Sequence, residues 1–333
     1  MQGKGFSPYI NRQSQRPLAP EACETQTFEK EPLMKEPTSE GLVTRHDFSP
    51  AAKSTKAKGA LASAKRLSRN KSQSDENALQ ILETFFRAFT PKTVPLLLLD
   101  YDGTLAPFRK DRFQAHPWSG VRDILAQIQQ GSTRIVFITG RPAGEIAPLL
   151  GLEHLEVWGL HGAEHLFPDG RRELAQLPET TLKNLAQLRA QLHQDSFGGL
   201  FEDKPNAAVM HWRGATAPKA AQIREKTLAI FAPLAGNHGL TLLEFESGVE
   251  LRAGPDKGSA VAAILSQSDP DSPAAFLGDD ITDESAFRAV NAHAKHGISI
   301  LVRHEKRETA ANLWLRPPAE LKSFLKSWQI ACK

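Results

Sequence analysis

The distribution of apolar residues between positions 74 and 328 predicts an alternation of buried strands and one-sided helices. Short apolar runs typical of strands buried on both faces lie at residues 96–99, 134–139, 157–160, 274–277 and 298–302. Between them, apolar residues recur every three or four positions, as in amphipathic helices. The helices we expect include residues 78–89, 121–128, 257–265, 284–290 and 321–328. This order predicts an α/β fold with a doubly wound parallel sheet.

A segment with a different rhythm interrupts this alternation. Residues 182–192 and 217–235 are typical of helices, and residues 201–203, 207–212 and 240–245 are typical of short strands. We expect these elements to form a smaller α/β domain inserted at residues 171–247. The larger domain then comprises residues 74–170 and 248–333, and its rhythm resumes at residues 250–252.

The first 73 residues lack sustained apolar periodicity and are rich in Pro, Ser, Thr, Gln and Lys. Residues 53–71 contain seven basic residues and no acidic one. Such a segment cannot bury enough apolar surface to offset its ordering entropy, so we expect a disordered basic tail. A weak docking arm for a polyanion or a protein partner is the alternative.

The overall composition narrows the class of protein. The chain has 333 residues and a formal charge of +3, a near balance that indicates neither a specific nucleic-acid partner nor an acidic membrane surface. Its two cysteines, Cys23 and Cys332, form neither a metal motif nor a disulfide framework. The N-terminus lacks the apolar run of a secretion signal, and no stretch is long enough to span a membrane. We therefore expect a soluble, cytoplasmic monomer.

Four polar clusters follow predicted strands or begin predicted helices. They are Asp100 with Asp102, Thr139-Gly140-Arg141, Lys257-Gly258, and the acidic run Gly278-Asp279-Asp280-Ile281-Thr282-Asp283. The carboxyl ends of the strands in a doubly wound sheet face one crevice, so these clusters should meet there. Crowded carboxylates require a cation, and an all-oxygen ligand set is typical of Mg²⁺.

This arrangement predicts phosphoryl transfer. Asp100 would attack phosphorus to form an aspartyl-phosphate, and Asp102 would act as general acid and then as general base. Thr139 and the neighbouring backbone N–H groups of Gly140 and Arg141 would hold phosphoryl oxygens, and Lys257 would stabilise their charge. The expected metal ligands come from the acids Asp100, Asp102, Asp279, Asp280 and Asp283.

Some assignments stay open at this point. Asp279 is the leading further ligand, whereas Asp283 could ligate the metal or orient water or Lys257. Taken singly, each cluster also has a structural explanation: a turn, a surface lysine, or acids at a helix start. Their joint occurrence at four strand ends favours an active site.

The motifs DYDGT, ITGR, DKG and GDDITD, in this order, resemble the four motifs of the haloacid dehalogenase superfamily of phosphotransferases. Within it, residues 95–328 are similar to the trehalose-6-phosphate phosphatase family, through Gly159-Leu160-His161-Gly162-Ala163-Glu164, Glu202-Asp203-Lys204, His211-Trp212-Arg213 and Val249-Glu250-Leu251-Arg252. The resemblance implies a haloacid-dehalogenase-like core, and it implies that the insert is a cap that closes over the crevice and binds the disaccharide. It also implies a set of substrate-binding residues: His161, Glu202, Lys204, His211, Arg213 and Glu250, the last reaching up from the core side.

One structural alternative and three departures from the family pattern accompany this resemblance. Alternating charged residues on a strand could instead form its solvent-facing side. Trp212 stands where the family usually has tyrosine, and Ser247-Gly248 replaces a common glycine-lysine pair, so that lysine's role is absent here. The basic tail has no counterpart in the minimal family pattern.

The expected activity is therefore Mg²⁺-dependent hydrolysis of trehalose 6-phosphate to trehalose and phosphate. Another sugar phosphate, such as sucrose phosphate or mannosyl-3-phosphoglycerate, is the nearest alternative substrate. A catalytically silent regulator or scaffold is a third possibility, but the presence of Asp100, Asp102, Lys257 and Asp279 argues against it.

Overall fold

The computed structural model describes residues 73–109, 111–194, 200–237, 239–245 and 247–332. The predicted tail, residues 1–73, lies outside these residues except for its last position. None of the described helices is long and apolar enough to cross a membrane.

Eight strands form the larger sheet, in the order β12-β11-β10-β1-β2-β3-β4-β5. Six of them, from β12 to β3, are parallel to their neighbours, and β4 and β5 are antiparallel. Their bounds are β1 Leu96–Leu99, β2 Arg134–Ile138, β3 Glu156–Gly159, β4 Glu164–Leu166, β5 Arg172–Leu174, β10 Ala274–Gly278, β11 Gly297–Val302 and β12 Leu313–Leu315. The predicted α/β class with a mostly parallel sheet is confirmed.

Strand β1 lies at the centre because all four of its leucines can be buried. It pairs with β10 on one side and β2 on the other, with Leu99 opposite Leu277 and Phe137. All four leucines have relative exposures of 1% or less. A strand with apolar side chains on both faces needs helices on both faces, and the structure supplies them.

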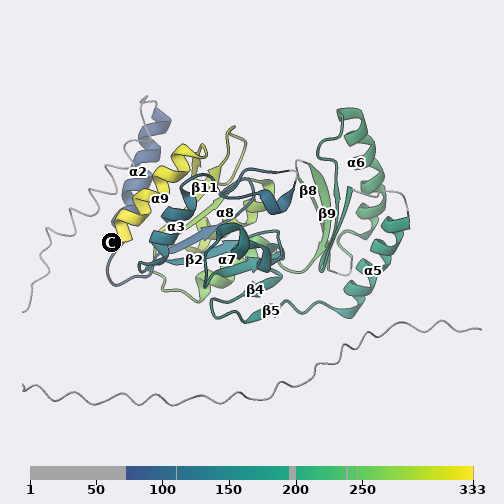
Figure 1. The fold of residues 1–333 in the computed structure, drawn as a ribbon, viewed down its shortest axis with the longest axis horizontal. Helices are drawn as coiled ribbons and strands as arrows, with labels where there is room; N and C mark the ends of the chain where they lie inside the picture. Colours follow the sequence, from purple (N-terminus) through teal and green to yellow (C-terminus); the bar gives the residue numbers. More distant parts are fainter. Residues whose placement is uncertain (1–72, 110, 195–199, 238, 246, 333) are drawn as a thin grey trace, which may run out of the picture. The chain divides into compact units, whose positions relative to one another are not determined.

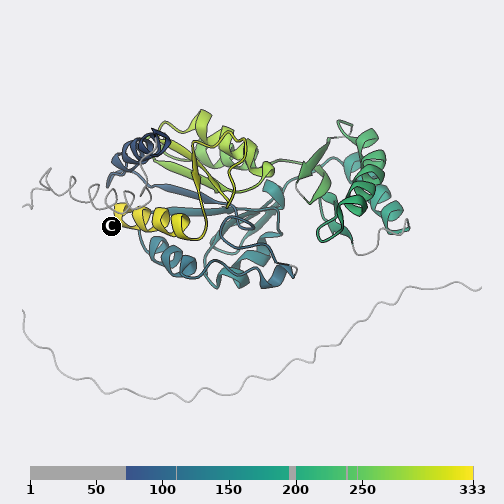
Figure 2. The ribbon, with the colours of Figure 1, turned by 90° about the horizontal axis from the view of Figure 1, so that it is seen from above.

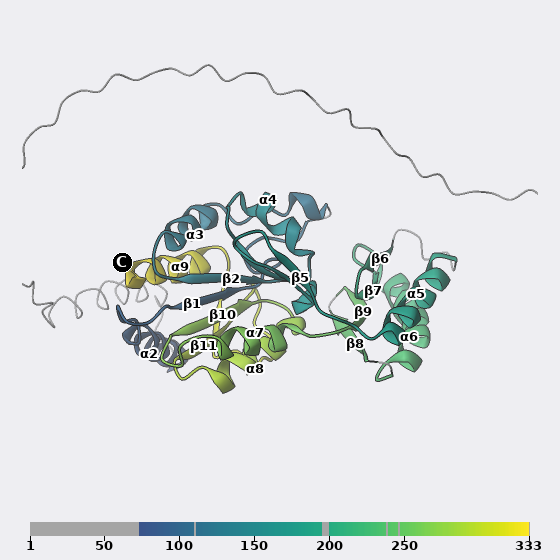
Figure 3. The same ribbon diagram turned by 90° about the horizontal axis from the view of Figure 1, so that it is seen from below.

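Helices cover the two faces of this sheet (Figure 3). On one face, α3 (Val121–Gln129), α4 (Ile146–Leu150) and α9 (Ala319–Cys332) share a core with the odd-numbered leucines of β1. On the other face, α7 (Lys257–Ser266) and α8 (Glu284–His293) pack on Leu96 and Leu98. Successive leucines of β1 point to opposite faces of the sheet and therefore pack into two different cores.

Helix α2 (Gln73–Arg87) lies beside α9 (Figures 1 and 2). Phe85 contacts the indole of Trp328 at a ring-centroid distance of 5.7 Å, and Phe86 lies 5.9 Å from Phe324. Trp328 is fully buried, and its Nε1 donates a hydrogen bond to Thr133 Oγ1 at 3.0 Å. This aromatic cluster attaches the first described helix to the last one.

Four antiparallel strands form the smaller sheet, in the order β6-β7-β9-β8. Their bounds are β6 Phe201–Lys204, β7 Ala207–His211, β8 Leu240–Phe245 and β9 Gly248–Ala253. Helices α5 (Glu179–Gln194) and α6 (Ala217–Phe231) pack against this sheet and bury a separate core that includes Leu185, Phe231 and Leu251.

Two boundaries of the insert differ from the sequence prediction. Strand β9 pairs with β7 and β8, so residues 248–253, including Glu250, belong to the smaller sheet and not to the core side. Conversely, β5, at residues 172–174, was predicted to lie in the insert but pairs with β4 in the larger sheet. The hydrogen-bonded pairing of β9 with β7 and β8, and of β5 with β4, decided both boundaries, and strand propensity alone does not say which strands pair.

We expect Trp328→Ala to lower the free energy of unfolding by about 3–5 kcal/mol, because it empties a large buried site among aromatic rings. Urea denaturation followed by circular dichroism measures the change. The exposed Leu174 provides the control, since Leu174→Ala should change stability by less than about 0.5 kcal/mol. Equal effects of the two substitutions would contradict the packing described for α2 and α9.

Candidate active site

Asp100 directly follows β1 at the carboxyl end of the parallel strands. Its carboxylate is buried, with Oδ1 at 2.7 Å from Lys257 Nζ and Oδ2 accepting a hydrogen bond from Thr104 Oγ1 at 3.1 Å. Burial raises the pKa of Asp100 to about 7 against the opposing effect of Lys257, and Asp283 raises it further. Lys257 therefore favours the ionised carboxylate in a site that otherwise disfavours it.

Lys257 is held at the first position of α7. Asp256 caps this helix by accepting the N–H of Ser259 at 2.8 Å, which fixes the direction of the chain entering it. The buried ammonium lies between Asp100 Oδ1 and Asp283 Oδ1, at 2.7 and 2.6 Å. Burial alone would lower the pKa of Lys257, but the two carboxylates hold it above its ordinary value.

Both oxygens of Asp283 are engaged. Oδ1 accepts from Lys257, and Oδ2 accepts the backbone N–H groups of Asp279 and Asp280 at 2.9 and 3.0 Å. This geometry shows Asp283 in contact with Lys257, one of the roles that the sequence left open, and Asp283 also belongs to the carboxylate cluster described below.

Asp279 approaches the turn after β1 closely because Gly103 lies there. Gly103 has a φ of 82°, and a Cβ at this position would come within 2.0 Å of Asp279 Oδ2. Any side chain would therefore clash with the carboxylate and strain the backbone. Burial raises the pKa of Asp279 well above its ordinary value, and the charges of Asp100 and Asp283 add to this effect.

The carboxylates of Asp100, Asp279 and Asp283 fit a small divalent cation. They offer oxygen atoms that all lie within 4.8 Å of one another, the one such cluster among the described residues. Burial raises the pKa values of Asp100 and Asp279, and the charges of the neighbouring carboxylates raise them further, which is the repulsion that a cation would relieve. An all-carboxylate oxygen set suits Mg²⁺.

The other two predicted metal ligands lie outside this cluster. The carboxylate of Asp102 accepts two hydrogen bonds from Arg141, Nε to Oδ2 and Nη2 to Oδ1, both at 2.6 Å. Asp280 caps the short helix η7 (Ile281–Asp283) and accepts the N–H of Ile281 at 2.7 Å.

The segment Thr139-Gly140-Arg141 follows β2, the neighbour of β1. The Arg141 side chain is bound by carboxylates: besides Asp102, Nη1 contacts Glu145 Oε2 at 3.3 Å. The backbone N–H of Arg141 donates to Thr139 Oγ1 at 3.2 Å. The structure thus brings Thr139 and Arg141 close to Asp102. The Arg141 guanidinium is bound by the carboxylates of Asp102 and Glu145, and the backbone N–H of Arg141, one of the groups expected to hold phosphate, donates to Thr139.

His161 lies in a strained turn, the helix η4 (Leu160–Gly162), after β3. Leu160 and His161 both have positive φ values, 51° and 58°, which cost of order 1–3 kcal/mol each and are typical of functional sites. Gly140 makes room for the ring, because a Cβ there would lie 2.5 Å from His161 Nε2. Burial lowers the pKa of His161 well below its ordinary value, and Lys204 lowers it further, so the imidazole is neutral at pH 7.

Most of the predicted substrate-binding residues contact one another. His211 Nε2 lies 2.8 Å from Glu202 Oε2, and Glu250 contacts both Lys204 Nζ and His161 Nε2 at 3.4 Å. Burial opposes ionisation of Glu202, but the hydrogen bond to His211 and the charge of Lys204 lower its pKa to about 2. Glu250 comes from β9, next to β7, and not from the larger sheet.

Arg213 lies apart from these contacts. Its Nη2 donates to Ser247 Oγ at 3.3 Å, and its guanidinium lies 4.8 Å from the ring centre of Phe108, a residue of the larger domain. The structure therefore does not join Arg213 to the contacts that link Glu202, Lys204, His211 and Glu250.

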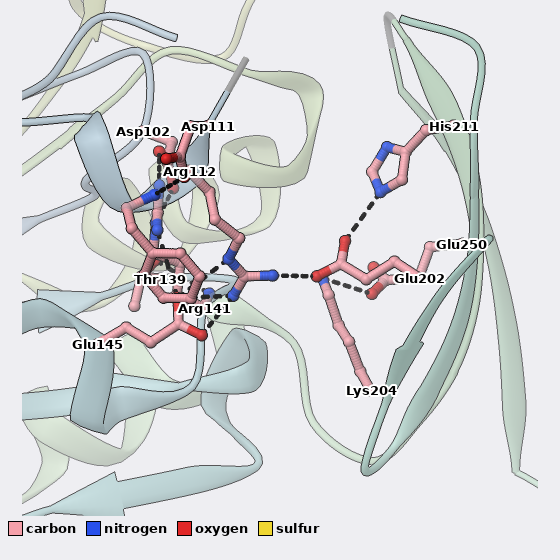
Figure 4. Close-up of polar contacts among 11 residues, drawn as sticks. Asp102, Asp111, Arg112, Thr139, Arg141, Glu145, Glu202, Lys204, His211 and Glu250 are labelled. Carbon is pink, nitrogen blue, oxygen red and sulfur yellow. Dashed lines mark hydrogen bonds and ion pairs between the residues drawn. The ribbon is translucent and has the colours of Figure 1, made fainter. Parts of the chain in front are cut away.

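Two residues that the sequence did not single out, Arg112 and Glu145, join the two groups of side chains (Figure 4). Arg112 lies in the short helix η2 (Arg112–Gln114), and its Nη2 donates to Glu145 Oε1 at 2.6 Å. Arg112 Nη1 also forms an ion pair with Glu202 of β6. In the sequence these two residues resemble ordinary charged positions, so no local signal identified them.

Comparison with known proteins identifies the family. The profile of the trehalose-phosphatase family matches residues 98–318. The chain belongs to this family. It is 30% identical over 244 residues to the trehalose-phosphate phosphatase of Mycobacterium marinum, an alignment that covers 69% of this chain and 60% of that protein. The chain thus spans less than two thirds of the length of such curated relatives.

Solved structures support the fold. The C-terminal domain of C. albicans trehalose-6-phosphate phosphatase aligns with a TM-score of 0.61 at 19% identity, over 76% of this chain and 95% of that one. The C-terminal domain of the Candida albicans trehalose synthase regulatory protein aligns with a TM-score of 0.55 at 12% identity, over 70% and 93%. The haloacid-dehalogenase-like fold predicted from the sequence is confirmed. A protein named as regulatory shares this fold, so the case for catalysis must rest on side chains.

We expect Asp279→Asn to raise the unfolding free energy of the metal-free protein by about 1–3 kcal/mol, because it removes a buried charge crowded by other carboxylates. The folded-state pKa of Asp279 lies above its unfolded value of 3.8. The carboxylate therefore costs stability at neutral pH, and the gain of the variant should vanish as the pH falls below that value. Thermal unfolding across this pH range provides the test.

The same variant tests the cation site. Millimolar Mg²⁺ should raise the melting temperature of the unsubstituted protein and have a smaller effect on Asp279→Asn, since binding to the folded state stabilises it. Asp271→Asn is the matched control, because Asp271 is exposed and pairs only with Lys295 among the contacts that the structure describes for it. An equal Mg²⁺ response in all three proteins would argue against a cation at Asp279.

Proposed function

We propose that this chain is a Mg²⁺-dependent phosphatase that hydrolyses trehalose 6-phosphate to trehalose and phosphate through an aspartyl-phosphate on Asp100. The observation that carries the proposal is the buried Asp100 carboxylate at the end of β1, 2.7 Å from the ammonium of Lys257. Lys257 favours the ionised form of this buried carboxylate, which is the form that a nucleophile requires.

In the first step, an oxygen of Asp100 attacks phosphorus and the bond from phosphorus to the sugar oxygen breaks. Lys257 offsets the negative charge that gathers on the phosphoryl oxygens, and Asp283 holds its ammonium in place. Thr139 lies at the end of the adjacent strand, where its hydroxyl supports the proposed contact with a phosphoryl oxygen.

Asp102 moves the protons of both steps. It gives a proton to the departing sugar oxygen, and it then takes one from the water that attacks the aspartyl-phosphate. In the structure both of its oxygens accept hydrogen bonds from Arg141, which fixes the position of the carboxylate. We therefore propose that Arg141 orients Asp102 for these proton transfers.

Asp100 and Asp279 are the residues that we propose to hold Mg²⁺, with Asp283 beside them. Bound there, Mg²⁺ supplies positive charge that offsets the repulsion between the carboxylates and the phosphoryl group. The raised pKa of Asp279 supports this assignment, because burial and the charges of Asp100 and Asp283 disfavour a carboxylate that a cation would stabilise.

The smaller sheet and its helices, from α5 to β9 (residues 179–253), are proposed as the cap that recognises the sugar. Glu202, Lys204, His211 and Glu250 present carboxylates and donors that suit the hydroxyls of a disaccharide. The Nδ1 atom of buried His161 has no hydrogen-bond partner among the described residues, which supports a contact with substrate. The predicted monomer, the cytoplasmic location and the role of the basic tail remain predictions.

Asp100→Asn should abolish phosphate release from trehalose 6-phosphate, by about a thousandfold or more, while the protein stays folded. The amide cannot form the acyl phosphate, although its shape fits the site. Asp271→Asn is the control, since Asp271 is exposed and pairs with Lys295. Activity near that of the unsubstituted enzyme would rule out the covalent mechanism.

Substrate preference separates trehalose 6-phosphate from the alternative sugar phosphates. We expect kcat/KM for trehalose 6-phosphate to exceed that for sucrose phosphate and mannosyl-3-phosphoglycerate by at least about tenfold, because the polar groups of the cap would be left unpaired by the wrong sugar. A smaller preference would leave the phosphatase chemistry intact and overturn the substrate assignment. No release of phosphate from any of them would favour a regulatory protein.

A further inference from the structure

We propose that Arg112 is a positioning residue that aligns Glu202 for sugar binding and ties this recognition to the catalytic edge of the larger sheet. The inference rests on the proposed function, in which Glu202 contacts the sugar. It concerns a residue that neither the sequence motifs nor the catalytic steps above employ.

Arg112 is fixed in orientation before it meets the smaller sheet. Asp111 caps η2 by accepting the N–H of Phe113 at 2.9 Å, which sets the backbone that carries the arginine. The guanidinium then contacts Glu145 through two nitrogens, Nε to Oε2 at 3.1 Å and Nη2 to Oε1 at 2.6 Å. A contact between a planar guanidinium and both oxygens of a carboxylate fixes the plane of the arginine as well as its position.

The remaining nitrogen, Nη1, points to β6 and donates to Oε1 of Glu202 (Figure 4). Oε2 of Glu202 accepts from His211 Nε2 at 2.8 Å, so each carboxylate oxygen has one partner. A carboxylate offers about four lone-pair positions, which leaves capacity for sugar hydroxyls. The Glu202 side chain keeps 27% of its surface exposed, so the carboxylate is held but accessible.

Consecutive ion pairs continue from Arg112 to the proton-transfer residue. Glu145 accepts from Arg112 on one side and lies 3.3 Å from Arg141 Nη1 on the other. Arg141 in turn binds Asp102. Glu202 and Asp102, which we assign to recognition and to proton transfer, are therefore two ends of one chain of charged contacts that crosses from the smaller sheet to the larger one.

A purely structural role for Arg112 fits the structure less well. The helix η2 has no buried residue, and 35% of the Arg112 side chain is exposed. Removing the guanidinium empties no part of the core, so the protein should fold without it.

The test measures Arg112→Gln and Arg112→Lys in the full-length protein with two substrates. Trehalose 6-phosphate engages Glu202, whereas p-nitrophenyl phosphate carries no sugar. We expect kcat/KM for trehalose 6-phosphate to fall about tenfold to a hundredfold in Arg112→Gln, the effect of one lost charged hydrogen bond, mainly through KM. Turnover of p-nitrophenyl phosphate should stay within about twofold. Arg112→Lys should recover only part of the loss, because an ammonium cannot hold Glu145 at two points and also reach Glu202.

A double variant identifies the residue through which Arg112 acts. Combined with Glu202→Gln, Arg112→Gln should cause no further loss, because the contact is already gone. Arg224→Gln is the matched control: Arg224 forms a comparable pair with Glu244, at 2.7 Å, on exposed parts of α6 and β8. Its activity on both substrates should equal that of the unsubstituted protein.

The outcomes separate this inference from the proposed function. An unsubstituted protein that does not hydrolyse trehalose 6-phosphate would overturn the proposed function and, with it, the role of Arg112. If that protein is active but Arg112→Gln behaves like Arg224→Gln, or loses both substrates equally, the positioning role is wrong and the function stands. Losses that multiply in the double variant would likewise overturn it.

Discussion

The position of the Lys257 ammonium is the constraint on which the candidate active site depends. It lies between Asp100 and Asp283, all three buried, in a place where several carboxylates would otherwise repel one another. Removing one member of such a group leaves an uncompensated buried charge, so the members are mutually dependent. Asp283 connects Lys257 to the chain that follows β10. One of its oxygens accepts from the lysine, and the other accepts the backbone N–H groups of residues 279 and 280. In the proposed function, Asp100 and Asp279 are the carboxylates that meet the cation, and Asp100 also meets the phosphate.

The second organising feature is the way that charged contacts pass from one sheet to the other. Arg112 and His161, both near the carboxyl edge of the larger sheet, contact Glu202 and Glu250 of the smaller one. In the proposed reaction these acids recognise the sugar, so recognition depends on residues that both sheets supply. An enzyme built this way gains its full set of polar contacts only when both parts meet, which couples binding of the whole substrate to catalysis.

The fold was predictable wherever local pattern and tertiary structure agreed. The leucines of β1 and the apolar run of β2 were expected as strands and form the centre of the sheet. The short strands β4, β5 and β12 were not expected, because three residues carry too little periodicity. The segment 248–253 has the composition of a buried strand and is separated from the end of β8 by two residues, a spacing typical of a hairpin that the sequence prediction did not use. Its pairing with β7 and β8 moved Glu250 from the expected core side into the smaller sheet.

The candidate site also has a part that the sequence predicted and a part that it did not. Sequence by itself determined that Asp100 and Asp279 share one edge, because strand ends in a parallel sheet converge whatever the details of packing. Lys257 begins α7, after β9 of the smaller sheet, so the convergence of strand ends does not by itself place it. Only the tertiary structure decided that Asp283 orients Lys257, that Arg141 binds Asp102, and that Arg112 reaches Glu202, ninety positions further along the chain. These partners are chosen by charge and distance in three dimensions. A charged residue in a polar loop looks alike in the sequence whether it faces water or another charge.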